Sequence, residues 1–248
     1  MAGAAVLGRL NWLAAKVIQV RPETERVRSI FFECPGWDGH MAGQHVDVRL
    51  TAEDGYQAQR SYSIGSAPED DQLVLTVERL QDGEVSPYLV DVLEASDELE
   101  MRGPIGRYFV WKHSMGGPLL MIAGGSGVVP FRSMLRHRVA SQTAVPTRLL
   151  YSARSFDDVI YGEELAGLGA HDEIDIRFTL TRSRPAGWRG YGRRIDGAML
   201  AEFSWAPEVR PLIYICGPTS FVETAAEALV DLGHDPMLIR TERFGPTS

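Results

Sequence analysis

The chain has 248 residues, of which 44% are hydrophobic and 23% are charged, and its formal net charge is −8. This composition is ordinary for a globular protein with a large core, in one or two domains. No apolar run approaches the ~20 residues that cross a bilayer, so the sequence predicts no membrane span.

The cysteines and the distribution of charge exclude further classes of protein. Cys34 and Cys216 are too few and too far apart for a disulfide framework or a four-cysteine metal site, which favours a reducing cytoplasm and predicts no bound metal. Residues 1–113 carry 11 basic and 18 acidic side chains, whereas residues 114–195 carry 11 basic and 7 acidic ones. This local surplus suits a small anionic ligand, while nucleic-acid binding would require a strongly basic domain.

The first half of the chain predicts short antiparallel strands. Alternating or β-branched runs occupy Leu13–Val20, Val27–Phe32, His45–Leu50, Arg60–Ile64, Leu73–Arg79 and Glu98–Met101. Glycine, proline and aspartate punctuate them, as in Asp54-Gly55 and Ala67-Pro68. Six strands in about 100 residues predict a small barrel, and Lys112–Gly117 is expected to be the linker that follows it.

The segment Arg60-Ser61-Tyr62-Ser63 carries the chemistry of this half. Alternation places Arg60 and Tyr62 on one face of a strand and the two serines on the other. An arginine fork suits a diphosphate, a tyrosine ring suits stacking on a flat heterocycle, and a serine hydroxyl suits a ring nitrogen. The segment therefore predicts a site for a nucleotide-like cofactor.

A second anion site is predicted near Gly83. The sequence Asp82-Gly83-Glu84-Val85-Ser86-Pro87 leads into a short predicted helix over residues 88–93. A glycine before a helix start favours an anion, because free backbone N–H groups and the helix dipole face it. From these residues alone, a hairpin loop with a capped turn is an equal alternative.

The pattern changes to α/β at Pro118. Leu119–Ala123 is a continuous apolar run, as expected of a strand buried on both faces of a parallel sheet. The loop Gly124-Gly125-Ser126-Gly127-Val128-Val129-Pro130 and an amphipathic segment over residues 131–139 follow it. Strand, glycine loop and helix together favour a diphosphate at the helix N-terminus, and Pro130 fits the first helical turn.

Further β/α alternation predicts a parallel sheet with crossover helices. Strands are expected over residues 147–152, 175–181 and 211–215, and helices over residues 163–168, 197–202 and from Ser220 to Gly233. Ser220 and Glu223 are expected to form a capping box at the start of the last helix. Cys216-Gly217-Pro218 ends the last of these strands, at the edge where ligands bind in open α/β sheets.

Several of these segments resemble the ferredoxin–NADP reductase family, in the family's order and over residues 12 to 244. Arg60–Ser63 is similar to its flavin signature, Gly83–Ser86 to its flavin-diphosphate loop, and Gly103-Pro104-Ile105-Gly106 to the turn that ends its barrel. Gly124–Pro130 and Cys216–Pro218 resemble its nicotinamide-nucleotide segments. The resemblance implies a Greek-key FAD-binding β-barrel domain over residues 1–113 and an NAD(P)-binding α/β parallel-sheet domain over residues 114–248.

The resemblance also implies roles for individual residues. Arg60, Gly83, Val85 and Ser86 would hold the FAD diphosphate, Tyr62 would stack on the flavin, and Ser63 would hydrogen-bond the flavin near N5. Gly125, Ser126, Gly127 and Pro130 would take the nicotinamide dinucleotide, and Cys216, Gly217 and Pro218 would border the nicotinamide. Glu242 would carry protons or give polar support. Phe244 either shields the flavin or packs with the tail between the domains.

The coenzyme is expected to be NADPH rather than NADH. Arg154, Arg182 and Arg194 follow strands or lie in loops where a 2′-phosphate would be held, and no acidic residue stands where a 2′-hydroxyl partner is expected. Arg132, Arg136 and Arg138 share one predicted helix and are considered as a docking face for an acidic carrier, with a solvated helix face as the alternative.

The implied activity is hydride transfer from NADPH to FAD, followed by single-electron transfer to a ferredoxin or flavodoxin. One alternative is the reductase component of an oxygenase, whose [2Fe–2S] domain would need four cysteine ligands. Another is a non-catalytic flavin-binding subunit of a larger complex, which the intact Gly124–Pro130 loop disfavours. The sequence leaves the physiological acceptor and the oligomeric state open.

Overall fold

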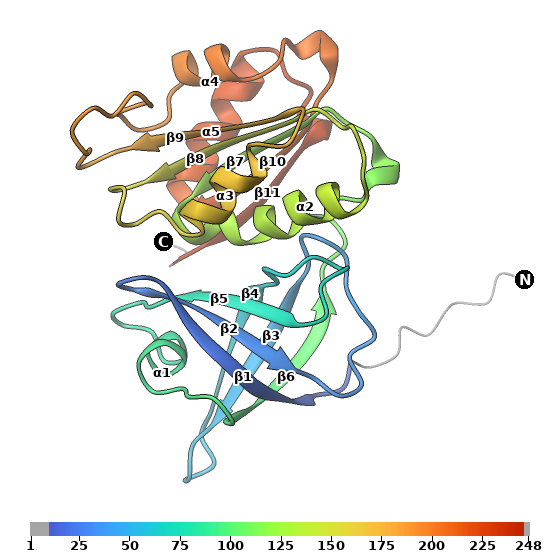
Figure 1. Cartoon of the computed structure of the whole chain (residues 1–248), viewed down its shortest axis with the longest axis vertical. Helices are drawn as coiled ribbons and strands as arrows, with labels where there is room; N and C mark the ends of the chain where they lie inside the picture. The colour runs from blue at the N-terminus through green and yellow to red at the C-terminus, as the bar shows by residue number, and fades with distance from the viewer. Residues whose placement is uncertain (1–9, 246–248) are drawn as a thin grey trace, which may run out of the picture.

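An antiparallel sheet and a parallel sheet organise the chain (Figure 1). The computed structural model describes residues 10–245. The first sheet contains β1 (Leu13–Thr24), β2 (Val27–Glu33), β3 (His45–Thr51), β4 (Gln57–Ser63), β5 (Leu73–Glu78) and β6 (Glu98–Ile105), in the spatial order β4-β3-β6-β1-β2-β5. All five of its pairings are antiparallel, which confirms the predicted architecture of the first half.

The antiparallel sheet curls until its two outer strands meet. Ile64, directly after β4, forms an antiparallel bridge with Leu75 of β5. Alternate residues point inward, so Val46 and Val48 of β3 are buried in one core with Leu75. The short helix α1 (Ser86–Asp91) adds Leu89 to this core, and Figure 1 shows it at one end of the barrel.

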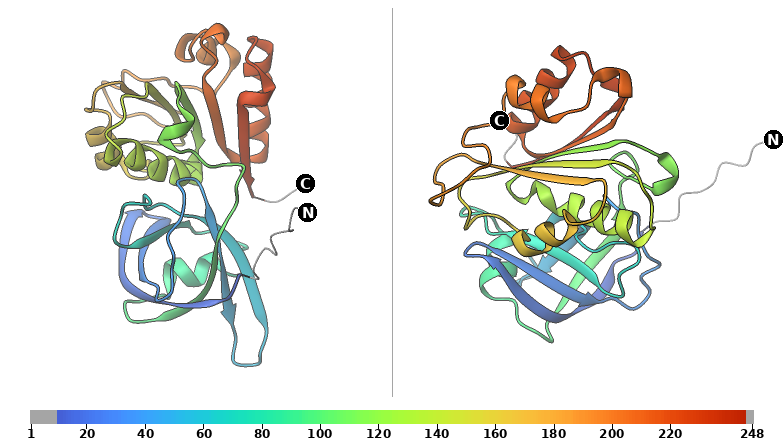
Figure 2. Two further views of the ribbon diagram at one scale, coloured as in Figure 1. Left: turned by 90° about the vertical axis from the view of Figure 1, so that its right-hand side faces the viewer. Right: turned by 45° about the horizontal axis from the view of Figure 1, so that its top comes forward.

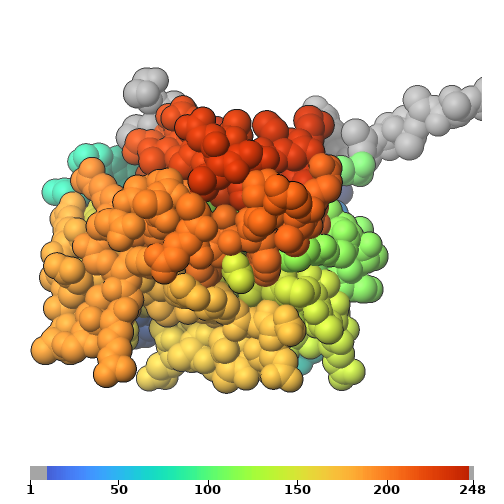
Figure 3. Space-filling view, turned by 90° about the horizontal axis from the view of Figure 1, so that it is seen from above, coloured from blue at the N-terminus to red at the C-terminus, as the bar shows by residue number. Residues whose placement is uncertain are grey.

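The second sheet is parallel and has helices on both faces. Its strands are β7 (Leu119–Gly124), β8 (Thr147–Ala153), β9 (Ile174–Leu180), β10 (Leu212–Pro218) and β11 (Ile239–Phe244), in the spatial order β11-β10-β7-β8-β9. Its helices are α2 (Val129–Ala140), α3 (Gly162–Leu168), α4 (Gly197–Phe203) and α5 (Thr219–Asp231). Figure 2 shows the sheet between two helical layers, and Figure 3 shows the molecule from above, with the C-terminal part of the chain, in orange and red, over the upper part of the face in view.

The two layers explain the apolar run of β7. Leu119 and Met121 lie in the core formed with α2 and α3, whereas Leu120 and Ile122 lie in the core formed with α4 and α5. Every residue of β7 is therefore buried, as the sequence predicts. Within residues 10–245, the longest apolar helical stretches are too short to cross a membrane.

One local expectation was wrong, and one strand was missed. The α5 helix begins at Thr219 with Pro218 as its N-cap and no side-chain cap, so Ser220 and Glu223 do not form a capping box. The terminal strand β11 was not predicted; it pairs with β10 in parallel, with Ile239 opposite Ile213. Its residues are mostly half-buried, and therefore their pattern is weaker than that of β7.

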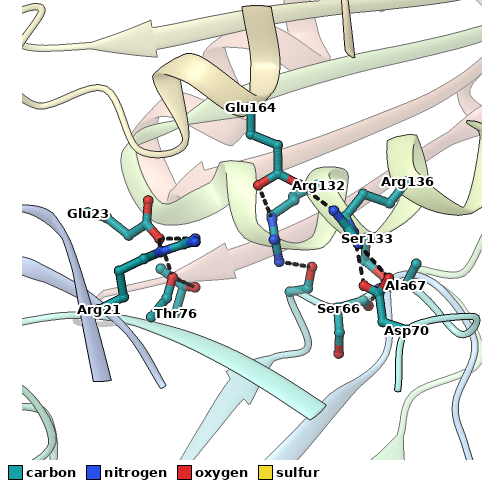
Figure 4. Close-up of polar contacts among 12 residues, drawn as sticks. Arg21, Glu23, Ser66, Ala67, Asp70, Thr76, Arg132, Ser133, Arg136 and Glu164 are labelled. Carbon is teal, nitrogen blue, oxygen red and sulfur yellow. Dashed lines mark hydrogen bonds and ion pairs between the residues drawn. The ribbon is translucent and has the colours of Figure 1, made fainter. Parts of the chain in front are cut away.

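The arginines of α2 are bound within the chain and do not form a docking face, and two of them, Arg132 and Arg136, contact the barrel domain (Figure 4). Arg132 is 5% exposed and donates to Glu164 and to the carbonyl of Gly65. Arg136 bridges Asp70 and Glu164 with contacts of 2.5 and 2.8 Å. The guanidinium of Arg138 donates to the backbone carbonyls of Val145 and Asp172 in neighbouring loops. These guanidinium groups are occupied within the chain, which overturns both interpretations of the helix.

Candidate functional site

The carboxyl ends of the parallel strands form one edge of the second sheet. Gly124 lies opposite Ser152, Ala153 lies opposite Leu180, and Pro218 lies opposite Phe244. The glycine loop, the Cys-Gly-Pro segment and the loops with the predicted arginines all leave the sheet at this edge. In open α/β sheets this is where ligands bind.

The glycine loop is shaped by contact with β10. It forms a 3-10 turn over Gly125–Val128 that runs directly into α2. Gly125 has a φ of +57°, which favours glycine, and a Cβ on Gly127 would stand 2.1 Å from the carbonyl oxygen of Cys216. Pro130 is buried in the first turn of α2, as predicted. The glycines thus hold the loop tightly against the end of β10.

Cys216 and Glu242 lie side by side on neighbouring strands. Their backbones are paired in the β10–β11 register, and Cys216 is only 3% exposed. Burial raises the pKa of the Cys216 thiol well above its usual value, and the charge of Glu242 raises it further. Burial also raises the pKa of the Glu242 carboxyl to about 7. The pair therefore combines a neutral thiol with a carboxyl that titrates near neutrality.

The remaining residues of this edge pack around an aromatic ring. Phe221 of α5 would lie 2.7 Å from a Cβ on Gly217 and 3.0 Å from one on Gly124, so both positions need glycine. Phe244 ends β11 opposite Pro218 and packs on the core beneath α2 and α3.

The predicted flavin residues lie on β4. Arg60 is exposed and pairs with Glu84 at 2.7 Å, while Tyr62 packs on the barrel core. Burial raises the pKa of the Tyr62 hydroxyl, so the ring stays neutral. Ser63 is half-buried and lies opposite His45 of β3.

The Gly83 loop is tightly folded. A Cβ on Gly83 would stand 2.8 Å from the hydroxyl oxygen of Ser86, and that hydroxyl accepts a hydrogen bond from the Leu80 N–H at 3.0 Å. Ser86 is buried, so its hydroxyl closes the loop. Val85 is the N-cap of α1 and supplies no capping side chain, which leaves the backbone N–H groups of the first turn without a side-chain acceptor.

The three predicted phosphate arginines are exposed at the sheet edge. The N–H of Arg182 donates to the carbonyl of Arg154 at 2.8 Å, which joins the loops after β8 and β9. The Thr179 hydroxyl donates to the carbonyl of Arg193, which brings the neighbouring Arg194 towards the end of β9. Within residues 10–245, Arg154, Arg182 and Arg194 form no ion pair with an acidic side chain.

Comparison with known proteins decides the family. Residues 15–110 match an oxidoreductase FAD-binding domain, and residues 121–227 match an oxidoreductase NAD-binding domain. Ferredoxin–NADP reductase B of Sorangium cellulosum is 34% identical over 238 residues, which cover 93% of this chain and 96% of that protein. The chain belongs to the ferredoxin–NADP reductase family. The predicted recognition and both predicted cofactor-binding domain types are thereby confirmed.

Other members of the family are longer or share the fold at lower identity. The glycine betaine monooxygenase reductase subunit of Chromohalobacter salexigens is 32% identical over 246 residues, but this chain spans 65% of its length. The FAD/NAD-binding domain of nitric oxide dioxygenase from Vibrio cholerae superposes with a TM-score of 0.83 at 25% identity, covering 94% of this chain and 99% of that one. A ferredoxin–NADP+ reductase from Neisseria gonorrhoeae, solved with FAD and NADP, shares the fold with a TM-score of 0.80 at 22% identity over 94% of this chain and 98% of that one.

Two acidic residues of the site were missed by sequence reasoning. Glu84 binds Arg60, and Glu78 at the end of β5 accepts a hydrogen bond from Ser126 of the glycine loop. Glu84 lies between Gly83 and Ser86 in the predicted diphosphate loop, and an acidic residue at that place was the available signal. Nothing in the sequence connects Glu78 to Ser126, because they belong to different domains.

Proposed function

We propose that the chain is a flavoprotein reductase that takes a hydride from NADPH onto bound FAD and passes single electrons to a separate protein. The contact of Ser126 with Glu78 carries this proposal, since it seats the dinucleotide loop against the barrel that matches FAD-binding domains. Two cofactor sites that adjoin at this contact suit direct transfer between stacked rings. We place the boundary between them at residues 113 and 114.

The residues of the barrel fit FAD. Arg60 offers an exposed guanidinium and pairs with Glu84, which lies just before α1 in the chain. The first turn of α1 offers backbone N–H groups without a side-chain acceptor. The FAD diphosphate would therefore find both a cation and neutral donors here. Tyr62 supplies a neutral aromatic ring two residues further along β4, and Ser63 supplies a hydroxyl. FAD, when bound, supplies the conversion of a two-electron hydride into single-electron transfers.

The second domain binds and orients the nicotinamide nucleotide. Gly125, Ser126 and Gly127 receive its diphosphate, and Arg154, Arg182 and Arg194 hold a 2′-phosphate, which favours NADPH over NADH. Cys216 packs as a neutral thiol at the floor of the site, with Gly217 and Pro218 beside it. Glu242 holds or releases a proton near neutral pH because burial raises its carboxyl pKa to about 7. Phe244 covers the end of the site from β11.

The electron acceptor is proposed to be a ferredoxin or flavodoxin in the cytoplasm. The name of the Sorangium relative supports this acceptor. The second candidate is an oxygenase component, because the Chromohalobacter relative is the reductase subunit of a monooxygenase. Comparing how fast one preparation of the purified reductase reduces a ferredoxin, a flavodoxin and an oxygenase component distinguishes the two candidate acceptors.

The experiment that tests the proposed function is anaerobic mixing of the purified protein with NADPH. We expect a yellow protein with one FAD per chain, whose flavin absorbance bleaches on mixing and returns when ferricyanide is added. A colourless protein that takes up neither FAD nor FMN refutes the proposal. A yellow protein that no nicotinamide nucleotide bleaches is instead a non-catalytic flavin carrier.

A further inference from the structure

Glu78 and Ser126 join the two domains at the start of the dinucleotide loop. Glu78 is the last residue of β5, the strand along the barrel face nearest the second domain (Figure 1). The Ser126 hydroxyl donates to its Oε2 atom at 2.8 Å. The backbone of Gly125 approaches the same oxygen, which lies 3.9 Å from the position that a Cβ would take. The contact ties the loop to the barrel, while Gly127 of the same loop lies against the Cys216 carbonyl.

In the part of the chain that the structure describes, the carboxylate of Glu78 lies beside this loop without a cationic partner. Within residues 10–245, Glu78 forms no ion pair with a lysine, arginine or histidine. Its carboxylate accepts a hydrogen bond from the neutral Ser126 hydroxyl. A coenzyme diphosphate on the loop would therefore meet a second anion at close range. Like charges in a partly desolvated crevice repel more strongly than they do in water.

The Ser126 hydroxyl can serve only one of these anions. A serine hydroxyl has a single O–H to donate, and both a carboxylate and an ionised phosphate oxygen only accept. While Ser126 donates to Glu78, it cannot donate to a diphosphate. Binding of the diphosphate through this hydroxyl must break the contact with Glu78.

We propose that Glu78 is a positioning residue that latches the Gly125–Val128 loop to the barrel until a nicotinamide-nucleotide diphosphate takes over the Ser126 hydroxyl. The inference rests on the proposed function of this loop. Glu78 holds the loop in place between turnovers and lowers the affinity for the coenzyme by competing for Ser126 and by repulsion. The same competition favours release of the oxidised coenzyme after it has delivered its hydride.

The test is calorimetric titration of NADP+, with NAD+ in parallel, into the FAD-loaded protein. The oxidised coenzyme delivers no hydride, so the readout is binding and not activity. Glu78→Gln removes the charge and leaves Ser126 only a weaker, neutral acceptor, because hydrogen bonds to charged acceptors are the stronger ones. We expect about tenfold tighter binding of NADP+ at low salt, equivalent to about 1.4 kcal/mol. The gain should shrink as salt screens the repulsion. Glu33→Gln, at an exposed carboxylate that ends β2, is the matched control and should bind as the wild type does.

A double-mutant cycle separates the exchange of Ser126 from simple repulsion. In a Ser126→Ala background, Glu78→Gln should improve binding less than it does in the wild type, because no hydroxyl remains to be contested. Unchanged or weaker binding by Glu78→Gln overturns the latch, and so does an equal gain with and without the Ser126 hydroxyl. Flavin content and Tm of each variant show whether it is folded. A wild-type protein that binds neither nucleotide refutes the proposed function itself, whereas wild-type binding that Glu78→Gln leaves unaltered refutes the latch alone.

Discussion

The carboxylate of Glu84 lies 2.7 Å from the guanidinium of Arg60 and accepts a hydrogen bond from the Tyr56 hydroxyl at 2.8 Å. These two hydrogen bonds hold the pKa of the Glu84 carboxyl below its usual value, the Tyr56 bond being the larger cause. The charged Glu84 carboxylate therefore binds the Arg60 guanidinium, which is proposed to hold the FAD diphosphate. Arg60 must exchange partners when FAD binds.

This exchange predicts opposite effects of two substitutions. Arg60→Ala should weaken FAD binding by roughly 1.5–3 kcal/mol, because a charge-assisted hydrogen bond is lost. Glu84→Gln should tighten it severalfold, because the competing anion is removed. Quenching of FAD fluorescence by the apoprotein measures both. Glu53→Gln, at an exposed position in the turn between β3 and β4, is the control. Equal or weaker FAD binding by Glu84→Gln would contradict the exchange.

The coenzyme preference should depend on Arg182. Arg182→Ala should raise the KM for NADPH by at least tenfold and leave the KM for NADH nearly unchanged, since only NADPH carries the 2′-phosphate. Arg26→Ala, on the turn that follows β1, serves as the control. A native preference for NADH, or an unaltered ratio of the two KM values, would show that these arginines are only surface charges.

The carboxyl of Glu242 should make stability depend on pH. Its pKa is raised from 4.5 to about 7 in the folded protein, so the folded state binds more protons than the unfolded state between these values. The free energy of unfolding should therefore fall as pH rises from about 4.5 to 7 and then level off. Urea denaturation at several pH values should show this fall in the wild type and a flatter profile in Glu242→Gln. Identical profiles in the two proteins would rule the effect out.

Glu164 should be essential for docking of the domains. It binds both Arg132, whose side chain is only 6% exposed, and Arg136 (Figure 4). Removing one partner of a buried ion pair typically costs about 3–5 kcal/mol, because the other charge remains buried. Glu164→Ala should therefore lower the urea midpoint strongly, while Glu163→Ala, at the exposed neighbouring position, should not. Equal urea midpoints for the two variants would show that the ion pairs of Glu164 do not contribute to stability.

Gly127 should tolerate no side chain. A Cβ there would stand 2.1 Å from the Cys216 carbonyl oxygen, so Gly127→Ala must displace the loop or the end of β10. We expect loss of stability and of NADP+ binding. A Cβ on Gly167 in α3 would meet nothing within 4 Å, so Gly167→Ala should be neutral or stabilising by roughly 0.5–1 kcal/mol. NADP+ affinity and Tm unchanged by Gly127→Ala would disprove the close approach.

The sequence by itself determined most of the secondary structure and the order of the domains. The continuous apolar run at Leu119–Ala123, the alternation around Arg60 and Tyr62, and the glycines of residues 124–127 are local signals, because burial on two faces, burial on one face and close backbone approach each restrict residue type at that position. The motif at Arg60–Ser63 and the loop at Gly124–Pro130 also predict cofactor sites at these two places, and these sites stay predictions.

The tertiary structure decided which charges meet. Arg132 and Arg136 looked free on a predicted helix face, but Gly65 and Asp70, more than 60 residues earlier, bind them. Strand β11 forms because β10 offers its edge to a half-buried segment whose own pattern is weak. Ser126 and Glu78, 48 residues apart in the chain, meet because the two domains pack against each other. Spacing along a chain predicts contacts within one helix or strand, whereas the partner of a polar side chain at a domain interface depends on how the two domains pack.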